Sequence, residues 1–262
     1  MNGQLSGAMP AGASTAEGAG TPWLTVGGRV FRSPMILGIE QYTSVHLIAE
    51  VLREGDCDVF ITTYDLRHDK PSVLLTDLDD VLDLDHFTWI GTTSYARGKA
   101  EALRTARMLH ATLGIDIVKL DVRPTDNRPH EGETVEAAAE LLDDGFAVLP
   151  FIMPDPEVAA ELAELGCCAL RVMAAPVGTG WGISDPGAIA EVIQEVDIPV
   201  IVEGGIGSPE HVVQAMSLGA SAVLVNTAVA RAPLPGHMAR AMRYAALAGQ
   251  YGLGQTLESA DD

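Results

Sequence analysis

The amino-acid sequence predicts a (β/α)8 TIM barrel, a single α/β domain in which eight parallel strands are surrounded by helices. Eight short apolar runs are each followed by a helix or a helix-sized segment. The chain has 262 residues, 47% of them hydrophobic, which is enough to bury one large core. An open doubly wound sheet is the alternative, but it needs fewer strands and a G-x-G-x-x-G fingerprint after the first, which here ends in GIEQYTS.

The predicted strands are short runs of apolar and β-branched residues bounded by turn signals. Before the first of them, residues 23–31 alternate around Gly27-Gly28, which predicts a two-residue β-hairpin. The eight barrel strands are expected at residues 34–38, 58–64, 87–94, 115–122, 146–152, 169–175, 198–206 and 222–228.

The helices between these strands are predicted from apolar residues at helical spacing. Three of them stop at a glycine, as a left-handed C-terminal cap requires: Gly145, Gly166 and Gly219. The helices are expected at residues 44–54, 78–84, 98–113, 134–144, 156–165, 185–196, 208–218 and 236–248. We expect a disordered Gly/Ala/Ser-rich tail at 1–22, the catalytic barrel at 23–250 and a flexible acidic tail at 251–262.

The composition narrows the classes of function. A formal net charge of −20 disfavours binding to nucleic acid or to anionic membranes. No stretch has the roughly 20 apolar residues of a transmembrane helix, and the N-terminus does not resemble a signal peptide. The three cysteines lack the spacing of metal ligands, and a reducing cytoplasm is the expected location. We therefore expect a cytoplasmic protein without a bound metal.

The fourth predicted strand, IDIVKLDV, contains a lysine among apolar residues. Lys119 and Asp121 are two residues apart and therefore point to the same face of the strand. Burial disfavours the charged form of a lysine, so the amine could attack a carbonyl group. The alternative is a lysine whose stem is buried while its charged end reaches water beside Asp121.

A phosphate site is predicted after strands seven and eight, where barrels of this class often bind phosphate. EGGIGSPE follows strand seven and NTAVA follows strand eight, so backbone N–H groups and polar side chains meet there. The loop VGTGWGI after strand six could close over the same phosphate. The expected phosphate-binding residues are Gly178, Gly180, Gly204, Gly205, Gly207, Asn226 and Thr227.

Other polar residues at predicted strand ends complete the candidate site. Glu203 closes strand seven, where its carboxylate could transfer protons during imine chemistry, a role that Asp121 could also fill. Neither a zinc-type histidine cluster nor a G-x-S-x-G elbow is present. Candidate contacts to sugar hydroxyls, chosen by strand-end position alone, are Tyr64, Asp65, Thr93, Ser94 and His130.

From about residue 24 to residue 249 the sequence resembles the thiazole synthases of thiamin biosynthesis. The resemblance rests on VKLDV, GFAVLP, APVGTGWGI, PVIVEGGIGSPEHVVQAMSLGASAVLVNTAVA and HMARAMRYAALAG. It implies a homo-oligomeric barrel enzyme in which Lys119 forms an imine with a phosphosugar, with Asp121 and Glu203 as proton carriers. Sulfur is then expected from a small ubiquitin-like carrier protein with a C-terminal thiocarboxylate, and no cofactor is expected.

The departures from the family lie on the substrate side. The family's G-T-G-K after strand one is Gly38-Ile39-Glu40-Gln41 here, its paired arginines after strand two are replaced by Tyr64-Asp65-Leu66, and Glu203 stands where Asp is usual. The chain thus resembles relatives of the 2-thiosugar synthase type from secondary (antibiotic) metabolism. The expected substrate is glucose 6-phosphate. The alternatives are a thiazole phosphate synthase acting on 1-deoxy-D-xylulose 5-phosphate and dehydroglycine, and a Schiff-base aldolase or isomerase that transfers no sulfur.

Overall fold

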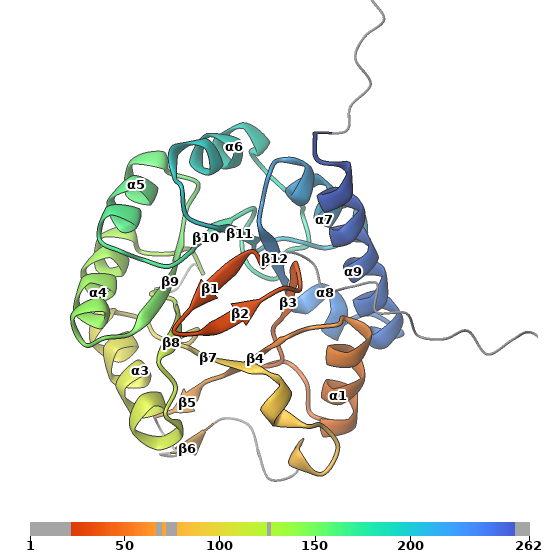
Figure 1. The fold of residues 1–262 in the computed structure, drawn as a ribbon, viewed down its shortest axis with the longest axis horizontal. Helices are drawn as coiled ribbons and strands as arrows, with labels where there is room; N and C mark the ends of the chain where they lie inside the picture. Colours follow the sequence, from red (N-terminus) through yellow and green to blue (C-terminus); the bar gives the residue numbers. More distant parts are fainter. Residues whose placement is uncertain (1–21, 67–69, 72–77, 125–126, 255–262) are drawn as a thin grey trace, which may run out of the picture.

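A ring of parallel strands forms the centre of the computed structural model, which describes residues 22–66, 70–71, 78–124 and 127–254 (Figure 1). The strand order is β3-β12-β11-β10-β9-β8-β7-β4, and β3 and β4 lie against each other where the ring closes. The (β/α)8 barrel predicted from the sequence is confirmed. The strands are β3 (Met35–Leu37), β4 (Val59–Thr62), β7 (Thr88–Thr92), β8 (Ile117–Leu120), β9 (Ala147–Ile152), β10 (Leu170–Met173), β11 (Val200–Glu203) and β12 (Ala222–Val225).

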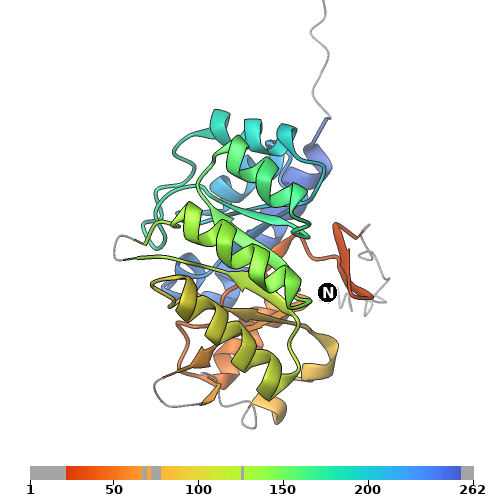
Figure 2. The same ribbon diagram turned by 90° about the vertical axis from the view of Figure 1, so that its left-hand side faces the viewer.

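Helices surround the strands, and the side view in Figure 2 shows several of them lying along the outside of the barrel. Gly145, Gly166 and Gly219 follow their helices with φ of 89°, 99° and 102°, so the predicted left-handed caps are confirmed. The helices are α1 (Val45–Glu54), α3 (Lys99–Leu113), α4 (Glu131–Asp143), α5 (Pro156–Glu164), α6 (Pro186–Glu195), α7 (Pro209–Ser217), α8 (Thr227–Ala230) and α9 (Pro235–Gly252).

The segment between β4 and β7 differs most from the prediction. A short antiparallel pair, β5 (Tyr64–Asp65) with β6 (Lys70–Pro71), follows β4. Among the described residues of the helix expected at 78–84, residues 78–79 are helical and residues 80–83 are not, and a 3-10 turn, η1 (Leu84–His86), follows. In a continuous helix Asp83 would lie three and four residues after Asp80 and Asp79, and repulsion between these carboxylates disfavours its continuation.

The strands are buried on both faces, which explains why they are almost continuously apolar in sequence. Side chains that point outward, such as Val118, Val172 and Val202, pack against the helices. Side chains that point inward, such as Ile117 and Ile201, fill the barrel. The interior is therefore a packed core, and among the described residues its buried charged groups meet near the carboxyl ends of the strands.

The N-terminal hairpin closes the opposite end of the barrel. It consists of β1 (Leu24–Val26) and β2 (Arg29–Phe31), and Figure 1 shows it lying across the barrel axis. Gly27 and Gly28 have φ of 56° and 76°, the left-handed values of the predicted tight turn. Leu24 and Phe31 belong to the same apolar cluster as the inward-facing strand residues. The hairpin thus extends the barrel core.

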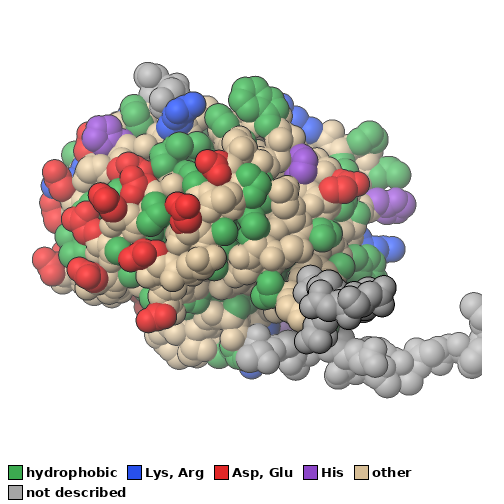
Figure 3. All heavy atoms as spheres, turned by 90° about the horizontal axis from the view of Figure 1, so that it is seen from above, with side chains coloured by type: hydrophobic (Ala, Val, Ile, Leu, Met, Phe, Trp, Pro, Cys, Tyr) green, Lys and Arg blue, Asp and Glu red, His purple; other side chains and the backbone are tan. Residues whose placement is uncertain are grey.

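Acidic side chains gather on one part of the surface (Figure 3). The exposed faces of α5 and α6 contribute Glu157, Glu161, Glu164, Glu191 and Glu195, and neither helix contains Lys or Arg. Such a surface repels polyanions. Within the described part of the chain, no helix combines the length and the apolar character needed to cross a membrane.

If the hairpin is part of the core, loss of its buried side chain should lower the stability of the protein. Phe31 is fully buried, so Phe31→Ala should lower the free energy of unfolding by about 3–5 kcal/mol, measured by urea denaturation. Tyr251→Ala, at a side chain that is 76% exposed, should change it by about 0.5 kcal/mol or less. Equal effects of the two substitutions would contradict the role of the hairpin as part of the core.

Candidate functional site

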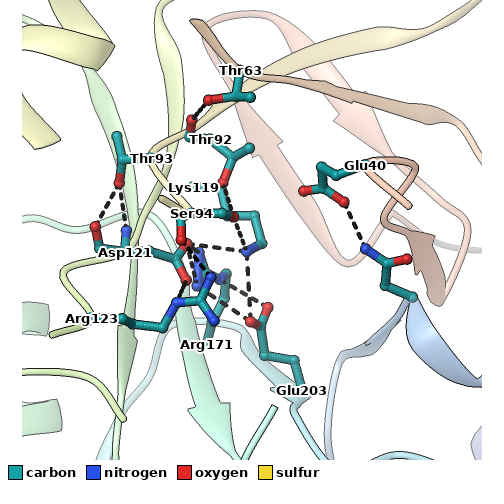
Figure 4. A network of polar contacts seen from close by, with 11 residues as sticks. Glu40, Thr63, Thr92, Thr93, Ser94, Lys119, Asp121, Arg123, Arg171 and Glu203 are labelled. Carbon is teal, nitrogen blue, oxygen red and sulfur yellow. Dashed lines mark hydrogen bonds and ion pairs between the residues drawn. The ribbon is translucent and has the colours of Figure 1, made fainter. Parts of the chain in front are cut away.

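Four charged side chains meet inside the barrel near the carboxyl ends of the strands. Lys119 lies on β8, Asp121 just after it, Arg171 on β10 and Glu203 at the end of β11 (Figure 4). Each is at most 6% exposed. Because a buried charge is tolerated only when it is paired, these residues must be considered as one cluster.

Lys119 is in contact with both carboxylates. Its Nζ lies 3.1 Å from Oδ2 of Asp121 and 3.6 Å from Oε1 of Glu203. The same nitrogen lies 3.4 Å from Oγ of Ser94, from the loop after β7. The predicted triad of Lys119, Asp121 and Glu203 is thus brought together in the structure, with Ser94 beside it.

Arg171 is the central residue that sequence reasoning missed. Its Nη1 and Nη2 donate to Oδ2 of Asp121 at 3.0 and 3.1 Å, and its Nε donates to Oε2 of Glu203 at 3.1 Å. The guanidinium lies 5.1 Å from the centre of the Phe151 ring. A signal was present in the sequence, because Arg171 interrupts the apolar run ALRVMAA as Lys119 interrupts its own strand.

The environment of Asp121 keeps this carboxylate ionised. Burial opposes ionisation, but the positive charges of Arg171, Lys119 and Arg123 outweigh it and lower the pKa of Asp121 to about 2. Arg123 contributes an ion pair of 3.1 Å between its Nε and Oδ1 of Asp121. Asp121 is fully buried, so it faces the other charged groups and not the solvent.

A cavity of about 460 Å³ opens above the cluster at the carboxyl ends of the strands. Lys119, Ser94 and Glu203 line it on one side. All seven residues expected to bind phosphate also line it: Gly178, Gly180, Gly204, Gly205, Gly207, Asn226 and Thr227. The cavity therefore joins the charged cluster to the glycine-rich loops that follow β10 and β11 and to Asn226 and Thr227 after β12.

Close backbone packing explains the glycines of these loops. Gly205 has φ of 68°, and a Cβ there would lie 2.4 Å from Cβ of Ala175. A Cβ on Gly207 would lie 2.5 Å from the carbonyl oxygen of Gly180, so the loops after β10 and β11 are in contact. The backbone of Gly182 also donates to Gly205 at 2.8 Å. Larger residues would separate the loops and displace the backbone that lines the cavity.

The loop after β3 forms another wall of the cavity and was not assigned a site role from the sequence. Nδ2 of Asn226 donates to Oε2 of Glu40 at 2.7 Å, and Nε2 of Gln41 donates to Oγ1 of Thr227 at 2.7 Å. A Cβ on Gly38 would lie 2.6 Å from the Asn226 amide nitrogen and 2.9 Å from the Asn226 Cβ, so a larger residue would force the Asn226 side chain to shift. Figure 4 shows the Glu40 carboxylate across the cavity from Lys119.

The five candidate sugar contacts occupy different places. Ser94 lines the cavity. Thr93 is buried, accepts a hydrogen bond from the backbone of Asp121 and donates one to its carbonyl oxygen, so it fixes the end of β8. Tyr64 packs with Leu109 and Ile115 outside the barrel, and neither Tyr64 nor its neighbour Asp65 lines the cavity.

The fifth candidate, His130, is exposed at the start of α4. Its Nδ1 accepts a hydrogen bond from the backbone of Glu133, which makes it the N-terminal cap of that helix. The helix begins at Glu131, three residues before the predicted start, because this cap precedes it. The structure thus gives His130 a structural contact away from the cavity.

Among the described residues, the cavity contains neither a cysteine thiol nor a cluster of metal ligands. Burial raises the pKa of the Cys167 and Cys168 thiols to about 12 and that of Cys57 further still. None of these three thiols lines the cavity. Within the described part of the chain, no group of three or more His, Cys, Asp or Glu residues could hold a metal ion.

The comparisons with known proteins agree with one another. The model of the thiazole biosynthesis protein ThiG matches residues 25–259. A thiazole synthase of Exiguobacterium sibiricum is 38% identical over 87% of this chain and 90% of its own length, and that of Bacillus subtilis is 37% identical over 87% and 89%. A chain of the crystallised BexX/CysO complex of Amycolatopsis orientalis is 57% identical, with a TM-score of 0.87 over 91% of this chain and 99% of that one.

The buried ion pairs predict a pH-dependent stability. Asp121→Asn leaves Arg171 without its main partner, so it should lower the free energy of unfolding at pH 7 by about 3–5 kcal/mol. The pKa of Asp121 is lowered from 3.8 to about 2 on folding, so its contribution is complete above pH 4–5 and is lost as the pH falls toward 2. Urea denaturation should therefore show the difference between the two proteins narrowing below about pH 4.

The matched control is Asp143→Asn, at an exposed aspartate of α4. It should leave stability within about 0.5 kcal/mol of the unmodified protein at every pH. A gap between the unmodified protein and Asp121→Asn that widens as the pH falls would contradict the assigned ionisation of Asp121.

Proposed function

We propose a function from one premise: this chain belongs to the thiazole synthase family. Within that family, it forms an imine between Lys119 and a sugar phosphate and then replaces a sugar hydroxyl with sulfur. The observation that carries the proposal is the position of Lys119, whose amine lies in a cavity that glycine loops border on another side. A phosphate bound at those loops would hold the sugar carbonyl toward the amine.

The first half of the reaction is imine formation at carbon 1 of an aldose phosphate, with glucose 6-phosphate as the proposed substrate. The neutral amine of Lys119 adds to the aldehyde, and water leaves as the imine forms. Transfer of the proton on carbon 2 to carbon 1, and of the carbon 2 hydroxyl proton to the nitrogen, then converts the imine into an amine with a ketone at carbon 2. Glu203 lines the cavity beside Lys119 and is suited to carry these protons.

The second half introduces sulfur at carbon 2. A thiocarboxylate adds through its sulfur to the ketone carbon, and the acyl group then passes from the sulfur to the oxygen on carbon 2. That oxygen leaves with the acyl group as a carboxylate, and a thioketone remains at carbon 2. Reversal of the proton shift and hydrolysis of the imine release a 2-thiosugar phosphate and free Lys119. The sum exchanges one hydroxyl for one thiol and one thiocarboxylate for one carboxylate, so no oxidant or other cofactor is needed.

The sulfur donor is proposed to be a small ubiquitin-like carrier protein with a C-terminal thiocarboxylate. BexX, which is 57% identical to this chain, was crystallised as a complex with a second protein, CysO. An external donor also agrees with the positions of Cys57, Cys167 and Cys168, whose thiols lie away from the cavity. We further propose that the enzyme is a homo-oligomer, as the family resemblance suggests.

The wall after β3 favours an aldose over the deoxyketose of the thiazole synthases. Glu40 presents a carboxylate to the cavity, held there by Asn226, and carboxylates accept hydrogen bonds from sugar hydroxyl groups. 1-Deoxy-D-xylulose 5-phosphate lacks a hydroxyl group at carbon 1 and has a shorter chain than a hexose phosphate. Conversion of that ketose to thiazole phosphate is the alternative function, with the same lysine and phosphate loops.

Imine trapping tests the first half of the reaction. The protein is incubated with glucose 6-phosphate or 1-deoxy-D-xylulose 5-phosphate, reduced with borohydride and examined by intact-mass spectrometry. We expect an adduct of glucose 6-phosphate on Lys119 and at most about one tenth as much from the deoxyketose, because a few lost hydrogen bonds correspond to tenfold or more in occupancy.

Lys119→Ala should abolish the adduct, whereas Lys99→Ala, at a surface lysine paired with Glu136 and Glu140, should leave it unchanged. An undiminished adduct in Lys119→Ala would remove the imine mechanism. An adduct with the deoxyketose alone would favour the thiazole reaction.

Sulfur transfer tests the second half. Addition of a thiocarboxylated carrier protein to the enzyme and glucose 6-phosphate should produce a sugar phosphate in which one oxygen is replaced by sulfur, detected as a mass increase of about 16. Glu203→Gln should lower the rate by about 10²–10⁴-fold, the usual contribution of a general acid–base group. Isomerised or cleaved sugar without incorporated sulfur would instead show an aldolase or isomerase.

A further inference from the structure

The nucleophile of this site lies among charges of both signs. Asp121 and Glu203 contact the Lys119 amine directly, and Ser94 is its neutral neighbour. The strand beside Arg171, β9, contributes the Phe151 ring to this region. Among the described residues, the remaining charged or titratable groups around the amine and its cavity are Arg171 on β10, Arg123 after β8, Glu40 after β3, Tyr95 after β7 and Arg231 after α8.

Two carboxylates beside a lysine favour the ammonium form. An ammonium has no free electron pair, so Lys119 must lose a proton before it can attack a carbonyl carbon. If the two carboxylates had no other partner, loss of that proton would leave them buried without a compensating charge, which is strongly unfavourable. The arrangement therefore needs a second cation that stays charged when the lysine does not.

Arg171 has the properties of that second cation. Its guanidinium remains protonated at any physiological pH. It donates to Asp121 at 3.0 and 3.1 Å and to Glu203 at 3.1 Å, so it contacts the same two carboxylates as Lys119. With Arg171 present, the two carboxylates are balanced by Arg171 and Arg123 even when Lys119 is neutral.

The contacts at one oxygen make the competition explicit. Oδ2 of Asp121 is approached by Lys119 Nζ at 3.1 Å and by Nη1 and Nη2 of Arg171 at 3.0 and 3.1 Å. Three donors at one carboxylate oxygen exceed what its lone pairs accept with good geometry. Withdrawal of the lysine amine toward a substrate therefore leaves Oδ2 still hydrogen-bonded.

We propose that Arg171 is a positioning residue that releases Lys119 as a neutral nucleophile by acting as the permanent counter-ion of Asp121 and Glu203. Arg171 is 1% exposed and does not line the cavity, so it acts through these carboxylates and not by contact with the substrate. The proposal rests on the proposed function to the extent that Lys119 acts as the amine of an imine.

The experiment measures how readily Lys119 is alkylated as the pH changes. Formaldehyde with cyanoborohydride methylates neutral amines and is small enough to need no sugar pocket. The folded protein is treated between pH 6 and pH 10, digested, and the modification of each lysine followed by peptide mass. Lys99, on the surface of α3, is the internal reference in every sample.

Arg171→Met removes the charge and keeps a side chain of similar length. In this variant we expect the methylation rate at Lys119 to rise with pH as it does in the unmodified protein, but with the whole profile displaced upward by at least one pH unit. At pH 7 the rate should therefore be about tenfold lower. The rate at high pH should match that of the unmodified protein. Arg171→Lys, which keeps a positive charge, should lie nearer the unmodified profile. Arg107→Met, at a surface arginine paired with Asp144, is the matched control and should change nothing.

A second substitution of opposite sign keeps the test decisive if Arg171→Met does not fold. Glu203→Gln removes one negative charge, so it should displace the profile at Lys119 to lower pH. The double variant Arg171→Met/Glu203→Gln removes a pair of opposite charges and leaves fewer unpaired ions in the core. Its profile should return close to that of the unmodified protein.

The outcomes separate this inference from the proposed function. A rate at Lys119 that stays lower by the same factor up to the highest pH, with no approach to the rate of the unmodified protein, would overturn the role of Arg171. An unchanged profile in Arg171→Met and in the double variant alike would do the same. If methylation follows the expected pattern but no sugar phosphate is trapped, the proposed function fails while the charge relationship stands. In the variants that still trap sugar phosphate, the pH profile of the trapping rate should be displaced in the same way as the methylation profile. The sugar phosphate concentration that gives half of the maximal rate should change little.

Discussion

The sharing of two buried carboxylates between a lysine and an arginine is the interaction on which the site depends. Charged groups inside a barrel lose their hydration, and the loss is compensated only by opposite charges with good geometry. Asp121 achieves this with partners from β8, β10 and the loop after β8. Glu203, at the end of β11, is paired with Arg171 of β10. The cluster therefore joins the strands on one side of the barrel while it holds the nucleophile in place.

The parallel sheet makes this convergence possible. Met173 of β10 lies opposite Glu203 of β11, and Arg171, two residues earlier, points to the same interior face as Met173. Arg171 itself lies opposite Phe151 of β9, whose ring supports the guanidinium. The long side chain of Arg171 can then extend toward the carboxyl ends of the strands, where Asp121 and Glu203 lie. A shorter cation at this register position would not reach both carboxylates.

The sequence predicts those parts of the site that depend on local spacing. The period of two along a strand places Lys119 and Asp121 on one face, and the strand count places Glu203 at the same end of the barrel. The sequence does not predict the role of Arg171. The partners of Arg171 are Asp121, just after β8, and Glu203 of β11, and they are brought to it only by the register between strands. The sequence misplaces Tyr64, because β4 ends at Thr62 and the chain turns outward into β5. His130 is misplaced because helix capping, which also uses polar residues in loops, competes with binding as the reason for a polar side chain.

The proposed reaction allows one barrel to act on different sugar phosphates, because the walls of its cavity come from different loops. The loops after β10 and β11 are fixed by backbone contacts in which no Cβ fits, as at Gly205 and Gly207, so they are poor places for variation. The loop after β3 has no such constraint at Glu40 and Gln41, which interact through their side chains with Asn226 and Thr227. A change at Glu40 would alter the hydrogen bonds available to the proposed sugar while Gly38 lies close to Asn226. In the proposed function, substrate choice can therefore change at this wall without disturbing Lys119, its counter-ions or the glycine loops proposed to bind phosphate.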